Sequence, residues 1–247
     1  MSPDTLSLSG KIAIVTGSGR ENGIGAAIAF ALARNGASIT INHVSDSVAP
    51  RAAAVAQRVE ELGGKATVVQ VDMSTPEGAA RLVDETCKAF GVDRIDILVN
   101  NAISGSPKPL MEETKEGIDA MMGTALYGPI FLIQKVVPKM PPGGRIINIG
   151  SIASKMGVPM SPLYSAAKLG RGYGITINTI MPGPVSTDTN TGEVQKQTHA
   201  RLVPLTRAEE REGRGEDIAD AVLLLTSEMS RWITGQTISV SGGITGN

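Results

Sequence analysis

The sequence has little of several features that would place the chain in other classes of protein. Cys87 is its only cysteine, which excludes an internal disulfide and any metal site with several cysteine ligands. Aromatic residues make up 3% of the chain, too few for a surface on which nucleotide bases stack. Basic side chains number 23 against 24 acidic ones, so there is no positive surplus to bind a phosphate backbone. We therefore expect no secreted disulfide scaffold and no nucleic-acid partner.

Long apolar runs are also missing. No stretch reaches the roughly 18 uninterrupted apolar residues of a membrane helix, and the start MSPDTLSLSG lacks the basic and apolar regions of a signal peptide. We expect a soluble cytoplasmic protein without a membrane partner. The 247 residues, 41% of them apolar, suit one globular domain over 1–247, with no repeat or linker dividing it.

Short runs rich in β-branched residues alternate with longer Ala-rich segments. The runs predict seven strands, over 11–16, 38–42, 66–71, 95–100, 145–150, 175–180 and 236–241. The segments between them have helical spacing and often stop at Gly, as at 24–36, 50–64, 76–91 and 216–228. This alternation predicts a Rossmann-like, doubly wound parallel seven-stranded α/β sheet in three layers. Ligands of such sheets bind beyond the carboxyl ends of the strands.

A glycine-rich turn, TGSGRENGIG, runs from Thr16 to Gly25 between the first strand and the first helix. Glycine lets the backbone approach a ligand closely, and free N–H groups at a helix N-terminus attract a diphosphate. Without its strand and helix the same cluster would equally suit a structural turn. In this context it predicts a dinucleotide site, with contacts from Gly17, Ser18, Gly19, Arg20, Gly23, Ile24 and Gly25.

The end of the second strand carries no carboxylate. A cofactor with a free ribose 2′-hydroxyl usually meets Asp or Glu there, whereas this chain has Asn42-His43-Val44-Ser45. Arg20 and Ser45 are placed to contact a 2′-phosphate, so we favour NADP(H) over NAD(H). A merely solvated Arg20 and an NAD-specific enzyme stay open as alternatives. His43 is expected in a loop, far in sequence from His199, and we expect no metal site.

Three residues after the fifth strand carry candidate chemistry. Ser151 follows that strand directly, and the spacing of Tyr164 and Lys168 puts both on one face of a helix. A nearby ammonium lowers the pKa of a phenol from about 10, which would make Tyr164 a proton donor to a carbonyl. Such pairs also occur by chance on exposed helices, so the pair alone is not diagnostic.

Taken in order, these motifs resemble the short-chain dehydrogenase/reductase family, from about Gly10 to Gly243. The glycine turn resembles the family's Thr-Gly-x-x-x-Gly-x-Gly signature. The resemblance implies further cofactor contacts, namely Asp72 to the adenine, Asn100 and Ala102 of the Asn-Asn-Ala segment, and Pro182, Gly183, Val185 and Thr187 around the nicotinamide carboxamide.

The resemblance also implies the reaction. Ser151 would polarise a substrate carbonyl, Tyr164 would exchange the proton, and Lys168 would bind the nicotinamide ribose and tune Tyr164. Both Tyr164 and Lys168 would thus touch cofactor. Hydride would pass between NADPH and a ketone or secondary alcohol.

Four departures from the family pattern bear on activity. Glu21-Asn22 lengthens the glycine turn by two residues, Ile103 replaces a common Gly, and Ala125 stands where a catalytic Asn is usual. About a dozen residues expected between Lys168 and Asn178 are missing, which shortens the helix after the catalytic pair and makes a homo-oligomer doubtful. A weakly active or inactive nucleotide-binding homologue is the alternative to an active reductase.

The substrate is a small carbonyl or alcohol compound that the residues do not identify. The stretch from Asp188 to Arg207 is expected to form a mobile lid, and its polar, irregular composition specifies no ligand. Similarity to 3-oxoacyl-acyl-carrier-protein reductases and to fungal polyketide and hydroxynaphthalene reductases suggests a β-ketoacyl or polycyclic ketone and a role in secondary metabolism.

Overall fold

The computed structural model describes residues 6–104, 114–152, 175–188 and 192–245. Seven parallel strands form one sheet in the order β3-β2-β1-β4-β5-β6-β7. Their bounds are β1 Ile12–Val15, β2 Ser38–His43, β3 Ala66–Gln70, β4 Ile97–Asn100, β5 Arg145–Ile149, β6 Thr176–Pro182 and β7 Thr237–Val240. The predicted fold is confirmed. His43 corrects one expectation, because it is the last residue of β2 and is 5% exposed, not part of a loop.

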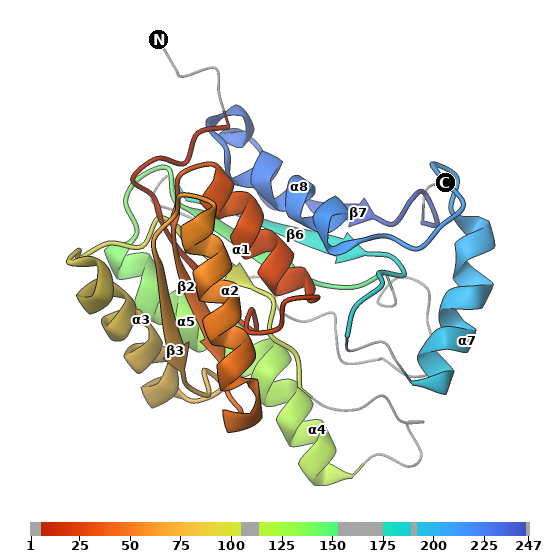
Figure 1. Ribbon diagram of the computed structural model, residues 1–247, viewed down its shortest axis with the longest axis horizontal. Coiled ribbons are helices and arrows are strands. Elements are labelled where there is room, and N and C mark those ends of the chain that lie inside the picture. Colours follow the sequence, from red (N-terminus) through yellow and green to blue (C-terminus); the bar gives the residue numbers. More distant parts are fainter. Residues whose placement is uncertain (1–5, 105–113, 153–174, 189–191, 246–247) are drawn as a thin grey trace.

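Helices cover both faces of the sheet (Figure 1). One face carries α1 (Ile24–Arg34), α2 (Ala49–Glu61) and α8 (Gly215–Thr226), and the other carries α3 (Pro76–Phe90) and α5 (Gly128–Val136). The described part also holds α4 (Lys115–Met122), α7 (Glu193–Leu202) and the short helices η1 (Asp46–Val48), η4 (Val137–Lys139), η5 (Val203–Leu205) and η6 (Glu228–Ser230).

The strands are apolar on both sides because both faces are covered. In β1, Ala13 and Val15 belong to the core beneath α1 and α8, whereas Ile12 and Ile14 belong to the core beneath α3 and α5. Because successive side chains of a strand point to opposite faces of the sheet, one strand contributes to two separate cores. A continuous apolar run such as IAIV is what a central parallel strand requires.

A single continuous helix runs from α4 through the π-helical segment η3 (Gly123–Tyr127) and α5 to η4. Pro129 has no N–H to donate to the carbonyl of Ala125 four residues earlier, which accounts for the break from regular α geometry. Among the described residues, the helix over 115–139 is long and apolar enough to cross a membrane by length and composition. One such helix is weak evidence for a membrane span, and on this helix Leu132 and Val136 pack fully buried against the sheet.

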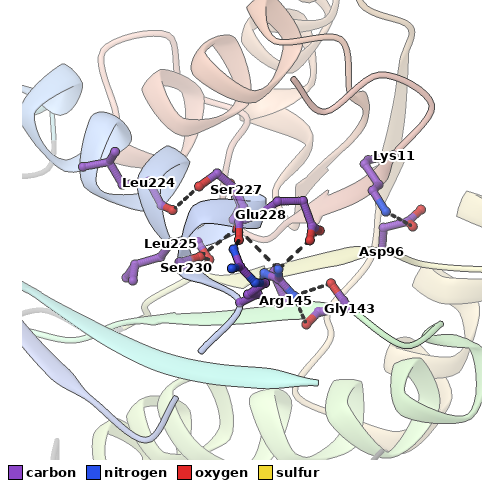
Figure 2. A network of polar contacts seen from close by, with 12 residues as sticks. Lys11, Asp96, Gly143, Arg145, Leu224, Leu225, Ser227, Glu228 and Ser230 are labelled. Carbon is purple, nitrogen blue, oxygen red and sulfur yellow. Dashed lines mark hydrogen bonds and ion pairs between the residues drawn. The ribbon is translucent and has the colours of Figure 1, made fainter. Parts of the chain in front are cut away.

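Two buried charged residues, Arg145 and Asp96, make contacts at the amino ends of the strands, opposite the carboxyl ends where ligands are expected (Figure 2). Arg145, 2% exposed, donates to the carbonyls of Gly143, Gly144 and Ser227 and lies 3.5 Å from a Glu228 carboxylate oxygen. Burial lowers the pKa of this guanidinium. Asp96, 3% exposed, accepts from the Ile12 N–H at 2.9 Å. The Asp96 contact joins the amino ends of β1 and β4, and the Arg145 contacts join the amino end of β5 to the segment after α8. The carboxyl ends of the strands are left for ligands.

Candidate functional site

The glycine turn packs tightly against the chain that follows β4. Gly17 has a φ of +62°, and a Cβ there would lie 2.8 Å from the Cα of Ala102. A Cβ at Gly25 would lie 2.6 Å from the Asn101 side-chain nitrogen and 2.8 Å from the Gly17 carbonyl oxygen. Real Cβ atoms do not tolerate such distances, so both positions require glycine.

Thr16 and Asn101 fasten this contact with hydrogen bonds. The Thr16 hydroxyl accepts from the backbone N–H groups of Asn101 at 2.9 Å and Ala102 at 3.0 Å. In return, the Asn101 amide donates to the carbonyl of Thr16 at 2.9 Å and to that of Gly17 at 3.2 Å. The first and fourth strand ends are thereby held in one fixed arrangement.

Asn42 supports the turn from the other side. Its side-chain oxygen accepts from the Gly17 N–H at 3.3 Å, and its side-chain nitrogen donates to the Val71 carbonyl at 2.9 Å. Asn42 is 1% exposed, so its amide organises the turn and faces away from solvent. The Ser18 hydroxyl is likewise engaged inside the protein, donating to the Val15 carbonyl at 2.7 Å.

Helix α1 begins beyond the turn without a side-chain cap. Gly23 is the N-cap residue, and the first turn of the helix contains no acidic residue. Uncapped N–H groups and the positive end of the helix dipole favour an anion at this point. The described geometry therefore fits the diphosphate of a dinucleotide, which also needs the close backbone approach that Gly17 and Gly25 permit.

Of the residues expected near the adenosine end, Ser45 and Asp72 follow the adjacent strands β2 and β3, and Arg20 lies in the glycine turn. Arg20, Ser45 and Asp72 are all exposed. The Ser45 hydroxyl lies 2.7 Å from that of Ser47, and a carboxylate oxygen of Asp72 accepts from the Ser74 N–H at 2.9 Å. At this end Arg20 contributes a guanidinium, Ser45 a hydroxyl and Asp72 a carboxylate.

The residues expected near the nicotinamide end lie around β5 and β6. Asn100 donates to the Asn148 side-chain oxygen at 2.8 Å. Ser151 is half-buried and follows β5, and on either side of it Gly150 and Ile152 donate to the Ile180 and Pro182 carbonyls. Ser151 thus lies beside the end of β6. Tyr164 and Lys168 lie outside the described residues, so their placement stays a prediction.

The segment after β6 is held by backbone contacts. Gly183 donates to the Val240 carbonyl at 3.0 Å, and a Cβ on it would lie 2.8 Å from the Ser241 Cα. Val185 pairs with Gly213 in a parallel bridge. The segment leads to Thr187, which is half-buried. These contacts fix the segment beyond the end of β6, and its nicotinamide role stays a prediction.

Two groups of residues in the site were not predicted from the sequence. Asn42 and Asn101 organise the glycine turn, and the signal for Asn42 was a polar residue at the end of a buried strand. The second group is an ion-pair cluster, in which Arg51 contacts Glu21 at 2.6 Å and also contacts Asp188. No sequence signal joins residues 137 positions apart.

Within the described residues, no group of three His, Cys, Asp or Glu side chains is arranged to hold a metal ion. His199 instead contacts Glu212, 2.9 Å between Nδ1 and Oε1.

Comparison with known proteins supplies the family. A family model described as enoyl-(acyl carrier protein) reductase matches residues 17–245. The chain is 38% identical to the short-chain dehydrogenase/reductase FrzI of a Cladobotryum species, covering 96% of this chain and 97% of FrzI. It is 35% identical to a 3-oxoacyl-[acyl-carrier-protein] reductase of Synechocystis, covering 96% and 98%, and 33% identical to a hydroxynaphthalene reductase of Aspergillus fumigatus, covering 95% and 92%.

Among solved structures, a blue fluorescent protein from a metagenomic library in complex with NADPH superposes with a TM-score of 0.86, at 36% identity and over 96% of this chain and 99% of that one. The expected resemblance is thus confirmed in sequence and in fold. The matched region contains the glycine turn from Gly17 onward, the Asn-Asn-Ala segment and Ser151, and it extends beyond β7. The chain belongs to the short-chain dehydrogenase/reductase family and is an oxidoreductase of that type, acting on CH–OH or C=O groups.

Proposed function

We propose that the protein is an NADP-dependent reductase that transfers hydride between NADPH and a ketone or secondary alcohol. The observation that carries the proposal is the glycine turn, packed without room for a Cβ at Gly17 or Gly25 and placed at the uncapped N-terminus of α1. NADPH, when bound, supplies the hydride.

NADP is favoured over NAD by the charges at the end of β2. The only ionisable side chain among Asn42, His43, Val44 and Ser45 is that of His43, whose Nδ1 lies 3.1 Å from the Ser45 carbonyl oxygen. No carboxylate in this stretch would repel a 2′-phosphate. Arg20 is exposed at the adjoining turn and can donate to such a group. A relative solved in complex with NADPH supports the binding of NADP.

The protein's residues would act on the substrate as follows. The Ser151 hydroxyl donates a hydrogen bond to the carbonyl oxygen as negative charge develops on it, which stabilises the transition state. The Tyr164 hydroxyl gives its proton to the same oxygen, and the Lys168 ammonium favours the resulting phenolate. In the oxidative direction each proton movement reverses.

Ala125 lies in the π-helical segment η3, where the family usually has a catalytic Asn. The hydroxyl oxygens of the neighbouring Thr124 and of Ser104 are 2.6 Å apart, and both hydroxyls donate to the Ala120 carbonyl one turn earlier. Whether the enzyme works without the Asn side chain is decided by the activity test below.

The test is to measure binding and oxidation of NADPH and NADH with a panel of β-ketoacyl thioesters and polycyclic ketones. We expect NADPH to bind more tightly than NADH and to be oxidised with at least one ketone. Tight binding of NADPH without turnover on any ketone would support the inactive homologue. Tighter binding of NADH would refute the NADP preference.

A further inference from the structure

Charged side chains from three distant segments meet beside the glycine turn. Glu21 and Asn22 belong to the two-residue extension of that turn, Arg51 lies in the first turn of α2, and Asp188 lies beyond the end of β6. The sequence separations across the two ion pairs are 30 and 137 residues. The cluster therefore joins parts of the chain that the sheet itself does not bring together.

Arg51 is the centre of the cluster. Its Nε donates to a Glu21 carboxylate oxygen at 2.6 Å, and one of its terminal nitrogens donates to a carboxylate oxygen of Asp188. One guanidinium thus bridges two carboxylates with its rigid fork of donors. The three side chains are between 30% and 39% exposed, so the bridge is open to solvent and can form and break.

The Asp188 carboxylate accepts hydrogen bonds from more than one side chain. Besides Arg51, the Asn22 side chain hydrogen-bonds to it and the charge of Arg20 acts on it, and together these groups lower the pKa of the Asp188 carboxyl. Asp188 is therefore ionised at neutral pH. Both residues of the turn extension take part, Glu21 by holding Arg51 and Asn22 by binding Asp188.

The two sides that the cluster joins are the diphosphate part and the nicotinamide end of the proposed cofactor site. The glycine turn lies on the diphosphate side, and Asp188 directly follows Thr187, which is expected at the nicotinamide carboxamide. The inner side of the turn is already held by Thr16, Asn42 and Asn101. The Glu21–Arg51 and Arg51–Asp188 ion pairs connect Asp188 to the turn through Glu21, which takes no part in those inner contacts.

We propose that Arg51 is a positioning residue, which with Glu21 and Asn22 clasps Asp188 and so retains bound NADPH between the glycine turn and Thr187. The inference rests on the proposed function, because NADPH is its ligand. It gives the extension of the glycine turn a role, since a turn of the usual length would lack the two side chains that hold Arg51 and Asp188.

A competing arrangement makes the opposite prediction. The donors around Asp188 are also suited to a phosphate, so Asp188 could occupy a place that NADPH needs. Removing the Asp188 charge would then strengthen cofactor binding. Under our proposal the same change weakens it, because release of NADPH no longer requires the ion pair to open.

The experiment measures NADPH dissociation by stopped-flow displacement for the wild type, Arg51→Gln, Asp188→Asn and the double variant. A partly exposed ion pair contributes little, so we expect dissociation to be about twofold to fivefold faster in each single variant. The double variant should be no faster than the faster single one, since both changes break the same contact. The KM for NADPH should rise while kcat stays the same or increases, and the melting temperature should not change.

Arg58→Gln is the matched control. Arg58 lies on the same helix and pairs with Glu61 at 2.7 Å, but its side chain is 57% exposed and does not contact Asp188. Unchanged dissociation in the Asp188→Asn variant, slower dissociation in it, or equal effects of Arg51→Gln and Arg58→Gln would overturn the proposal. A wild-type protein that binds no NADPH would instead refute the proposed function.

Discussion

Substituting Gly17 by alanine tests whether the glycine turn is built as described. Two costs arise at this position. The residue has a φ of +62°, which an L-residue with a side chain adopts at a cost of about 1–2 kcal/mol. The new Cβ would also lie 2.8 Å from the Cα of Ala102 and 3.1 Å from its Cβ, and relieving such crowding costs about 1–3 kcal/mol.

The two costs can be separated with a second glycine. Gly91 ends α3 with a φ of +64°, and a Cβ there would meet nothing within 4 Å. Gly91→Ala should therefore lower the free energy of unfolding by the backbone cost alone, about 1–2 kcal/mol. Gly17→Ala should lower the free energy of unfolding by about 2–5 kcal/mol, the sum of both costs.

Urea unfolding followed by circular dichroism measures both free energies, provided that the slope with urea is the same in all three proteins. The informative quantity is the difference between the variants, since the backbone cost cancels. If Gly17→Ala is no less stable than Gly91→Ala, then Gly17 does not lie against Ala102 and the description of the turn is wrong.

Further predictions concern the opposite sheet edge, the cofactor and the π-helical segment. Arg145→Met should lower the free energy of unfolding by about 1–3 kcal/mol by leaving buried carbonyls without their donor, whereas Glu228→Gln, 44% exposed, should change it by less than about 1 kcal/mol; equal losses in urea unfolding would contradict this. Arg20→Ala should weaken NADPH binding about tenfold or more and leave NADH binding nearly unchanged, as titration calorimetry would show; an equal loss for both cofactors would mean that Arg20 does not contact the 2′-phosphate. Ala125→Asn should raise kcat for ketone reduction, and no gain would show that the Asn side chain is not needed here.

The sheet could be predicted from the sequence because each strand is a short β-branched run between helical segments. Helices cover both faces of the sheet, so the strands are continuous apolar runs, and their alternation with helices indicates a parallel, doubly wound sheet. The glycine turn was equally evident, since its position between β1 and α1 is fixed by local sequence.

Contacts between distant residues could not be predicted. The sequence shows an asparagine at position 42, but the inward position of its amide depends on where Gly17 and Val71 lie in space. Arg51 lies on a polar helix face, and no residue near it in the sequence indicates that its partners are Glu21 and Asp188. The π-helical turn at Ala125 could have been anticipated only from Pro129, because that proline removes one helical donor.

The most direct test of the proposed chemistry is the rate of ketone-dependent NADPH oxidation by Tyr164→Phe, with Tyr127→Phe as the control that removes a half-exposed phenol elsewhere. We predict that Tyr164→Phe lowers kcat by about 10²-fold or more while NADPH binds as tightly as before, because only the proton donor is lost. Tyr127→Phe should leave kcat unchanged. Undiminished turnover by Tyr164→Phe would contradict the account, since the proton would then come from another group.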